Sequence, residues 1–264
     1  VELGRAMGAF VRELRTVTRP LAGTRLRAAG LDDWATDNLL GYLDDQAEAT
    51  DVVPDDHTIV VERFRDEIGD WRLVVHAPWG ARVTSPWALL VSAQITARLG
   101  IDADVMATDD GLVLRLLDTD QDDQWWEDLL DALAIEPEDL TRQLSQEITR
   151  SALFAAKFRE CSSRALLLTR NAPGRRTPLW QQRQRSAQLL AVASKYPTFP
   201  MLLETSRECL QDVFDLPALR EVLGQLRSRA IRVVSVDTAK ASPFAQSLLF
   251  NWIAAFMYEG DSPL

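Results

Sequence analysis

The sequence predicts an α+β fold in which helices flank a small antiparallel sheet or partial β-barrel, followed by a helix-rich C-terminal half. Three observations predict it. Apolar residues recur at helical spacing up to about Thr50. Between residues 57 and 118, β-branched runs alternate with turn residues, which is typical of strands joined by hairpins. From Glu136 the helical spacing returns and continues almost to the end of the chain.

Three helices are expected before the first strand. An apolar stripe at helical spacing covers 2–17, and Pro20 and Gly30 bracket a second, shorter helix. Asp32 and Asp33 are suited to begin a third helix, because their carboxylates accept hydrogen bonds from the first unpaired amides of a helix. The chain therefore opens with a helical segment.

The strand-rich segment contains two expected hairpins separated by a helix. The β-branched run 58–65 and the returning run 71–76 flank an Asp-Glu-Ile-Gly-Asp turn and predict the first hairpin. The runs 105–108 and 112–116 flank an Asp-Asp-Gly turn and predict the second. Between the hairpins a helix is expected over 86–99, with proline as its first residue.

The remainder of the chain is expected to be mainly helical. The acidic segment 118–128 is interpreted as solvated surface, and 231–236 is the one later strand candidate. The expected helices are 137–149, 151–167, 178–195, 199–213, 216–229 and 243–258.

These patterns divide the chain into three expected parts. They are the N-terminal helices (1–56), a strand-rich module (57–135) and a helical module with a basic block (136–264). A single compact domain is the alternative, because the change near residue 136 is one of composition alone.

The composition excludes several classes of protein. With 47% hydrophobic residues, 26% charged residues and a net charge of −10, the chain is an ordinary globular protein. It has no run of about 18 apolar residues that could cross a membrane, and no signal peptide. The first residue is not methionine, which indicates a piece of a longer protein. The two cysteines, Cys161 and Cys209, form no disulfide framework, so a cytoplasmic location is expected.

The motifs of common catalytic and metal sites are missing. There is no Gly-x-x-x-x-Gly-Lys-Ser/Thr loop and no Gly-x-Ser-x-Gly turn. His57 and His76 lack zinc-site spacing with the cysteines. Asp55 and Asp56 beside His57 are more typical of an exposed turn than of an acid–base site, and Glu62 is expected to pair with arginines of the first hairpin. The chain itself is expected to be non-catalytic and to hold no cofactor or metal.

Basic residues gather in one segment of this acidic protein. Residues 151–190 carry eight cations and one carboxylate, Glu160, so their net charge of +7 leaves −17 on the rest of the chain. Seven of these cations are arginines, which bind phosphates bidentately and stack on bases. This block indicates either an anionic partner or, with about equal weight, ion pairs within the protein itself.

Several tryptophans lie beside arginines near strand ends. Trp71 begins the strand opposite Arg63 and Arg65, and Trp79 lies in the turn before Arg82. A tryptophan in such a place can stack on a base of a single strand. The alternative, favoured for any one tryptophan on pattern alone, is a half-buried ring that covers the edge of the sheet.

Longer strings of the sequence resemble one family. They resemble the DEAD/H-associated region of the Lhr (large helicase-related) superfamily 2 helicases, in order and over nearly the whole chain. The strings lie in 60–72, 76–83, 151–161, 174–185, 208–214 and 242–261.

The resemblance implies a parent enzyme with two RecA-like motor domains, a winged helix and then this region. Such parents are ATP-dependent helicases that track 3′-to-5′ along single-stranded DNA, unwind RNA–DNA or DNA duplexes and are associated with DNA repair. ATP and Mg would bind in the parent's motor domains, which this chain lacks, so the implied partners here are the tracking strand and the neighbouring domains.

The resemblance also implies a tryptophan that stacks on a base of the tracking strand. The position of Trp71 within the matching segments favours it for this role, with Trp34 and Trp79 as alternatives. The basic block is then a candidate surface for binding the nucleic-acid backbone. The full set of expected nucleic-acid-binding residues is Trp71, Arg63, Arg65, Arg82, Arg159, Arg164, Arg175, Arg176, Trp180, Arg183 and Arg185.

Three functions therefore compete. The first is a nucleic-acid-binding accessory domain of a helicase, which predicts salt-dependent binding to single strands. The second is a structural or docking module without DNA binding of its own, which predicts exposed apolar surface. The third, an independent nuclease or glycosylase, would need a metal cluster or an activated carboxylate that the sequence does not supply.

Overall fold

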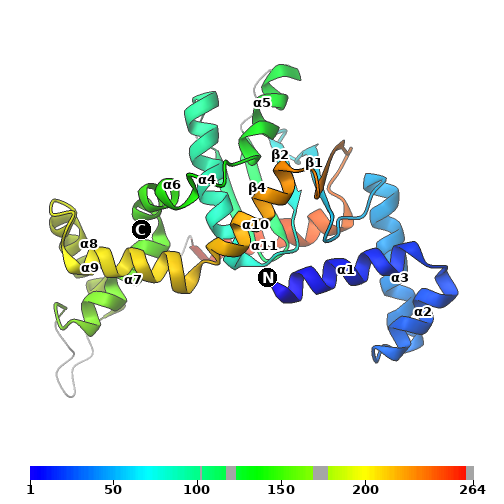
Figure 1. Ribbon diagram of the computed structural model, residues 1–264, viewed down its shortest axis with the longest axis horizontal. Coiled ribbons are helices and arrows are strands. Elements are labelled where there is room, and N and C mark those ends of the chain that lie inside the picture. The colour runs from blue at the N-terminus through cyan, green and yellow to red at the C-terminus, as the bar shows by residue number, and fades with distance from the viewer. Residues whose placement is uncertain (102, 117–122, 169–177, 260–264) are drawn as a thin grey trace. The chain divides into compact units, whose positions relative to one another are not determined.

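The computed structural model describes residues 1–264 except for 102, 117–122, 169–177 and 260–264 (Figure 1). The chain forms two compact units. The sheet unit comprises residues 1–135 and 218–264, and the helical unit comprises 136–217. Residues 218–264, which the composition groups with the helical module, belong to the sheet unit because they supply a strand and a helix to it.

The N-terminal helices follow the sequence pattern. They are α1 (Glu2–Thr16), α2 (Arg19–Ala28) and α3 (Asp33–Thr50). The Asp32 carboxylate caps α3 as expected, because it accepts a 2.7 Å hydrogen bond from the amide of Ala35. The three helices share a small apolar core, which consists of Leu14, Ala22, Leu26, Leu40, Leu43 and Val53.

Two glycines allow α1 to lie unusually close to the rest of the sheet unit. A Cβ atom at Gly4 would lie 1.8 Å from the carbonyl oxygen of Pro78, and one at Gly8 would lie 2.6 Å from the amide nitrogen of Asp56. One turn further along, Arg12 donates from Nε and Nη2 to the two carboxylate oxygens of Asp56, at 2.8 and 3.0 Å. Close backbone contact and a bidentate ion pair therefore hold α1 in place.

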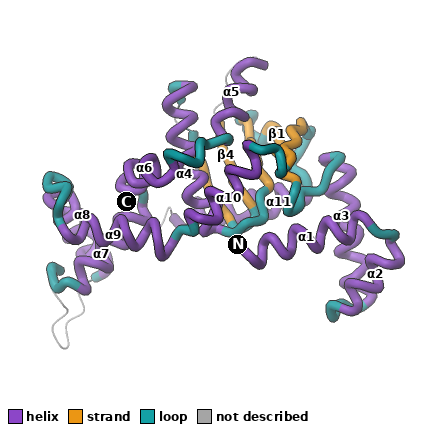
Figure 2. Tube along the Cα trace, viewed as in Figure 1, coloured by secondary structure: helices purple, strands orange, loops and turns teal. Residues whose placement is uncertain are grey.

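The sheet has five strands in the part of the chain that the structure describes (Figure 2). They are β1 (Thr58–Arg65), β2 (Trp71–His76), β3 (Asp104–Thr108), β4 (Gly111–Leu116) and β5 (Arg232–Asp237), in the order β3-β4-β2-β1-β5. Both expected hairpins are confirmed, and α+β is the correct class.

Of the two expected forms, a small sheet and a partial barrel, the structure has the first. The sheet is open, because its edge strands β3 and β5 do not pair with each other. It is also not purely antiparallel, because β5 returns from the far end of the sequence and pairs in parallel with β1, Val60 lying opposite Val234. Residues so distant in the chain leave no turn signal that would predict the pairing.

Helix α4 (Ala81–Leu99) begins five residues before the expected proline start. Gly80, at a φ of 83°, turns the chain into the helix, and Asp109 Oδ1 accepts a 2.7 Å hydrogen bond from the amide of Ala81. Pro86 therefore lies inside the helix, where it removes one backbone donor. A side-chain cap supplied from a distant turn explains why the sequence pattern missed this start.

Two more helices complete the described core around the sheet. Ala245, Leu248 and Trp252 of α11 (Pro243–Glu259) form an apolar cluster with side chains of β1, β2 and β4. The described part of the acidic segment forms α5 (Asp123–Leu133), which sequence analysis missed. The buried Trp87 indole of α4 donates to the carbonyl of the last residue of α5, at 2.9 Å.

The helical unit contains α6 (Leu140–Glu147), α7 (Ala152–Arg164), α8 (Leu179–Ala193) and α9 (Pro200–Arg207), and α9 continues as a π-helical segment (Glu208–Val213). Ser151 caps α7 by accepting from the amide of the third residue along, at 3.1 Å. Helix α7 packs against both α8 and α9. The buried side chains of this unit include Leu140, Leu144, Phe154, Phe158, Cys161 and Cys209.

Candidate nucleic-acid interface

Trp71 lies in a cluster of cations and rings at one corner of the sheet, here called the sheet corner (Arg63, Arg65, Trp71 and Trp126). Trp71 is half-buried and pairs across the strands with Arg65, whose guanidinium carbon lies 4.4 Å from the centre of the indole. The guanidinium carbon of Arg63 lies 5.3 Å from the same ring. Trp126 of α5 meets Trp71 edge to face, with centroids 5.3 Å apart. Arg63 and Arg65, the neighbours that favoured Trp71 as a base-stacking residue, thus already stack on its ring.

The two arginines of the sheet corner also have other partners. Arg63 binds both carboxylate oxygens of Asp237 on β5, with Nε 2.6 Å from Oδ1, and its guanidinium carbon lies 4.2 Å from the centre of Trp126. Arg65 donates from Nη1 to the carbonyl of Gly69 at 2.8 Å. Arg63 is therefore a structural cation, whereas Arg65, the last residue of β1, stays exposed.

The structure separates the two rival tryptophans. Trp79 is 1% exposed, so its ring is part of the core and presents no face to a ligand. Trp34, in the first turn of α3, is 76% exposed, and no ring or guanidinium stacks on it among the described residues. Of the three candidates, Trp34 is the one with an open face.

Polar residues that sequence analysis did not single out lie close to Trp34. Arg19 and Arg27 of α2, with Thr36 and Asp37 of α3, line a cleft of about 210 Å³. Together with Trp34, these residues are called the α2–α3 tip. The hydroxyl of Thr36 is buried there and has no hydrogen-bond partner within the described residues. The signal that could have found this site is a tryptophan just after a helix cap, preceded by three closely spaced arginines, Arg19, Arg25 and Arg27.

The cations of the α2–α3 tip are held by carboxylates at the surface. Arg27 donates to Asp33 at 3.1 Å, and Arg19 pairs with Asp44. Both arginine side chains remain about half exposed, at 48% and 55%. Exposed pairs of this kind contribute little to stability, so a phosphate can replace either carboxylate at low cost.

The basic block lies in the helical unit, and two of its described cations form ion pairs with carboxylates of the same unit. Arg164 binds Glu208 and donates to the thiol of Cys161 at 3.3 Å, and Lys157 binds Glu160 at 2.8 Å. This lysine holds the pKa of the Glu160 carboxyl below its usual value. Lys157 and Arg164 therefore form ion pairs within the protein, as the second interpretation of the block expects.

Helix α8 carries exposed residues of the basic block. Trp180, in its first turn, is 58% exposed, and Arg183 and Arg185 are exposed on the same helix. Trp180 and Arg183 are three residues apart and so are neighbours on the helix surface. Arg175 and Arg176 lie outside the described residues. Two further expected contacts, Arg159 of α7 and Arg82 of α4, are half-buried and exposed, respectively.

The described residues offer no alternative site based on a metal. No group of three or more histidine, cysteine, aspartate or glutamate side chains is placed to hold an ion in the described ranges. None of the helices in those ranges combines the length and apolar character needed to cross a bilayer. Cys161 and Cys209 are both buried and free, and burial raises the pKa of the Cys209 thiol to about 11.

The chain belongs to the DEAD/H associated family, whose model matches residues 53–245. It is 51% identical, over 263 residues, to "Lhr helicase/ probable uracil glycosylase" of Mycolicibacterium smegmatis, and 50% identical, over 229 residues, to "Lhr helicase/uracil glycosylase" of Escherichia coli. These alignments cover 100% and 86% of the chain but only 17% and 14% of the relatives, so the chain corresponds to about a sixth of their length.

More distant relatives and a solved structure agree with this family. "ATP-dependent helicase Lhr-Core" of Sulfolobus acidocaldarius is 27% identical over 75% of the chain and 22% of that relative. The structure of Mycobacterium smegmatis helicase Lhr bound to ssDNA and AMP-PNP matches 94% of the chain and 31% of its own chain, with a TM-score of 0.87 and 50% identity. The resemblance to Lhr helicases seen in the sequence is confirmed.

Proposed function

We propose that the chain is the nucleic-acid-binding accessory region of an Lhr-type ATP-dependent 3′-to-5′ DNA helicase, and that it lines the path of the tracking single strand. The observation that carries this proposal is the match, at a TM-score of 0.87 over 94% of the chain, to a helicase whose structure contains single-stranded DNA. Exposed cations and exposed indoles on both units support it, because they are the side chains that bind backbones and stack on bases.

Within this function, Trp34 takes the stacking role in preference to Trp71. A base needs one free face of an indole, and Trp34 has it, whereas Trp71 is covered by two guanidinium groups and Trp126. Arg19 and Arg27 would bind the adjacent phosphates, with the unpaired hydroxyl of Thr36 as a further donor.

The other candidate contacts lie on both units. In the helical unit they are Trp180, Arg183, Arg185 and Arg159, together with Arg175 and Arg176 by charge alone. In the sheet unit they are Arg65 and Arg82. Arg63 and Arg164, which are already bound to Asp237 and Glu208, would act mainly in holding the fold.

The parent protein supplies what this region lacks. ATP and Mg would bind in its RecA-like motor domains, and those domains with the winged helix would be the protein partners of this region. Single-stranded DNA or an RNA–DNA hybrid would be the substrate, and the free cysteines fit a cytoplasmic location.

The test is fluorescence anisotropy of a labelled single strand of about 20 nucleotides with the whole chain, at low and at physiological salt. We expect binding that weakens steeply with salt. Trp34→Ala should weaken it about 5- to 150-fold, because stacking contributes about 1–3 kcal/mol per base. Trp71→Ala is the matched control and should have the smaller effect, while Arg183→Ala/Arg185→Ala should flatten the salt dependence.

The outcomes distinguish this function from the alternative of a docking module that does not bind DNA on its own. Absence of binding at low salt would refute autonomous nucleic-acid binding and favour a module that acts only beside the motor domains. The apolar side chains exposed on the helical unit agree with that alternative; they include Leu166, Leu167, Leu179, Val192, Tyr196 and Leu203. Equal losses for Trp34→Ala and Trp71→Ala would contradict the assignment of Trp34.

A further inference from the structure

A partly open cavity of about 270 Å³ lies in the sheet unit, where α1, α3 and α11 meet the segment after β2. Its walls are mainly apolar, and the rings of Tyr42 and Phe244 lie 5.0 Å apart at an angle of 32° beside it. A cavity of this size is slightly smaller than the usual site for a drug-sized molecule, and therefore suits a single ring system. The apolar lining residues are Met7, Val11, Pro54, Pro78, Phe244 and Leu248.

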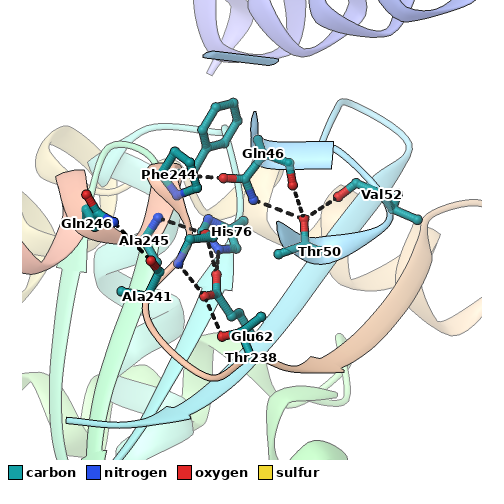
Figure 3. A network of polar contacts seen from close by, with 12 residues as sticks. Gln46, Thr50, Val52, Glu62, His76, Thr238, Ala241, Phe244, Ala245 and Gln246 are labelled. Atoms are coloured by element: carbon teal, nitrogen blue, oxygen red, sulfur yellow. Dashed lines mark hydrogen bonds and ion pairs between the residues drawn. The ribbon is translucent and has the colours of Figure 1, made fainter. Parts of the chain in front are cut away.

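One cavity residue, His76, is held by a fully buried carboxylate (Figure 3). His76 is 2% exposed, and its Nε2 lies 3.0 Å from Oε2 of Glu62, which is 0% exposed. The same carboxylate accepts from the amide and hydroxyl of Ser242, at 2.7 and 2.5 Å, and from the hydroxyl of Thr238 at 3.0 Å. The network ties β1 and β2 to the start of α11.

This network determines which nitrogen of His76 is available to a ligand. Burial raises the pKa of Glu62, but the hydrogen bonds from His76 and Ser242 outweigh it, so the pKa lies below its usual value and the carboxylate is ionised. An ionised carboxylate only accepts, so the imidazole hydrogen is on Nε2. Nδ1 has no hydrogen-bond partner within the described residues, and in the neutral ring it is an acceptor.

Asp110 provides a second acceptor at the cavity. Its backbone carbonyl accepts from the amide of Ala77 at 2.9 Å, which fixes the β3–β4 turn beside His76, and burial raises the pKa of its side-chain carboxyl. The hydroxyl of Tyr42, by contrast, already donates to the carbonyl of Pro243 at 3.1 Å. The cavity therefore combines apolar walls with two acceptors.

We propose that this cavity binds a planar heteroaromatic ring that carries an amino group, of which adenine is the simplest example. The ring would lie between the apolar walls, and its N–H groups would donate to Nδ1 of His76 and to the carboxylate of Asp110. The base can belong to a free nucleoside or to a strand. The site is separate from the α2–α3 tip, so the inference does not depend on the proposed function.

The test is titration of the whole chain with adenosine, followed by NMR shifts of the His76 and Tyr42 side chains. We expect saturable binding, at least about 10-fold tighter than that of purine riboside, which lacks the amino group. Asp110→Asn should weaken the binding of adenosine about 5-fold, since it replaces a charged acceptor by a neutral one. Asp45→Asn is the control: it removes the same charge from an exposed residue of α3 that is not part of the cavity, and it should change nothing.

A second pair of variants tests the cavity itself. Ser247 is exposed at the cavity on α11, so Ser247→Phe should block binding without disturbing the core, whereas Gln246→Phe, one residue away, should not. Adenosine that fails to saturate the chain, purine riboside that binds equally well, or a Ser247→Phe variant that still binds would each overturn the proposal.

Competition identifies the source of the base. Displacement of adenosine by an oligo-dA strand but not by an oligo-dT strand would support a base from a bound strand, and displacement by neither would support a free nucleoside. Strand binding measured by anisotropy should be unchanged by Ser247→Phe if it uses the α2–α3 tip. Failure of this inference and failure of the proposed function are therefore distinguishable.

Discussion

One buried carboxylate of the sheet unit, Glu62, contrasts with two exposed ion pairs of the helical unit. Glu62 is fully buried and accepts four hydrogen bonds, whereas Lys157–Glu160 and Arg207–Glu204 are exposed pairs within single helices. A buried carboxylate cannot exchange its donors for water without a large cost, and an exposed one can. The comparison teaches that a buried charge such as Glu62 fixes the fold, whereas the cations of exposed pairs, in the helical unit and at the α2–α3 tip alike, are available to a polyanion.

The largest expected effect comes from the buried carboxylate. Glu62→Gln removes the charge and turns part of the side chain into a donor that faces other donors, so we expect a loss of roughly 3–5 kcal/mol in the free energy of unfolding. Urea denaturation of the whole chain, followed by circular dichroism, measures it. Glu160→Gln, the same substitution on the exposed surface of α7, is the control, and equal losses for the two variants would break the comparison.

Close packing in the sheet unit can be tested without changing a charge. Gly4→Ala places a methyl group against the carbonyl of Pro78 and should cost about 1–3 kcal/mol as α1 is displaced. Gly41→Ala in α3 meets nothing within 4 Å and should stabilise the protein by about 0.5–1 kcal/mol, because alanine is the better helix former. Thermal melts of the two variants should move in opposite directions, and a shared direction would contradict the close contact of α1.

The smallest expected effect is the pH dependence of the contribution that Glu62 makes to the free energy of unfolding. The pKa of Glu62 is lowered in the folded protein, so its stabilising effect is present above the ordinary glutamate pKa and is lost as the pH falls through the folded value. The stability difference between the wild type and Glu62→Gln should therefore narrow from pH 5 to pH 3. A constant difference over that interval, measured by urea denaturation, would show that the carboxylate does not titrate there.

Most elements of the fold could be predicted because their signals are local. The cap of α3, the first hairpin and the helices of the C-terminal half all follow from neighbouring residues. The parallel pairing of β5 with β1 and the early start of α4 could not, since each depends on a contact between distant segments. The same limit explains the error at Glu62: its carboxylate binds Thr238 and Ser242 from far along the chain, together with His76, rather than the hairpin arginines.

The candidate site was predicted less well than the fold, because exposure is a tertiary property. Trp71 and Trp34 both lie near arginines in the sequence, and only the folded chain shows that Trp71 is covered and Trp34 is open. Trp180, Arg183 and Arg185 remain candidates because most residues of the basic helix α8 are exposed.

The parallel strand β5 has a consequence for how the protein is made on the ribosome. Strand β1 emerges early, but its partner is not complete until Asp237, after the whole helical unit has been synthesised. At a translation rate of about 5–20 residues per second, the edge of β1 stays unpaired for on the order of 10–30 s after its own synthesis. The helical unit has that interval in which to fold, and the open edge of β1 is the place where a nascent chain of this family would be most exposed to wrong pairing.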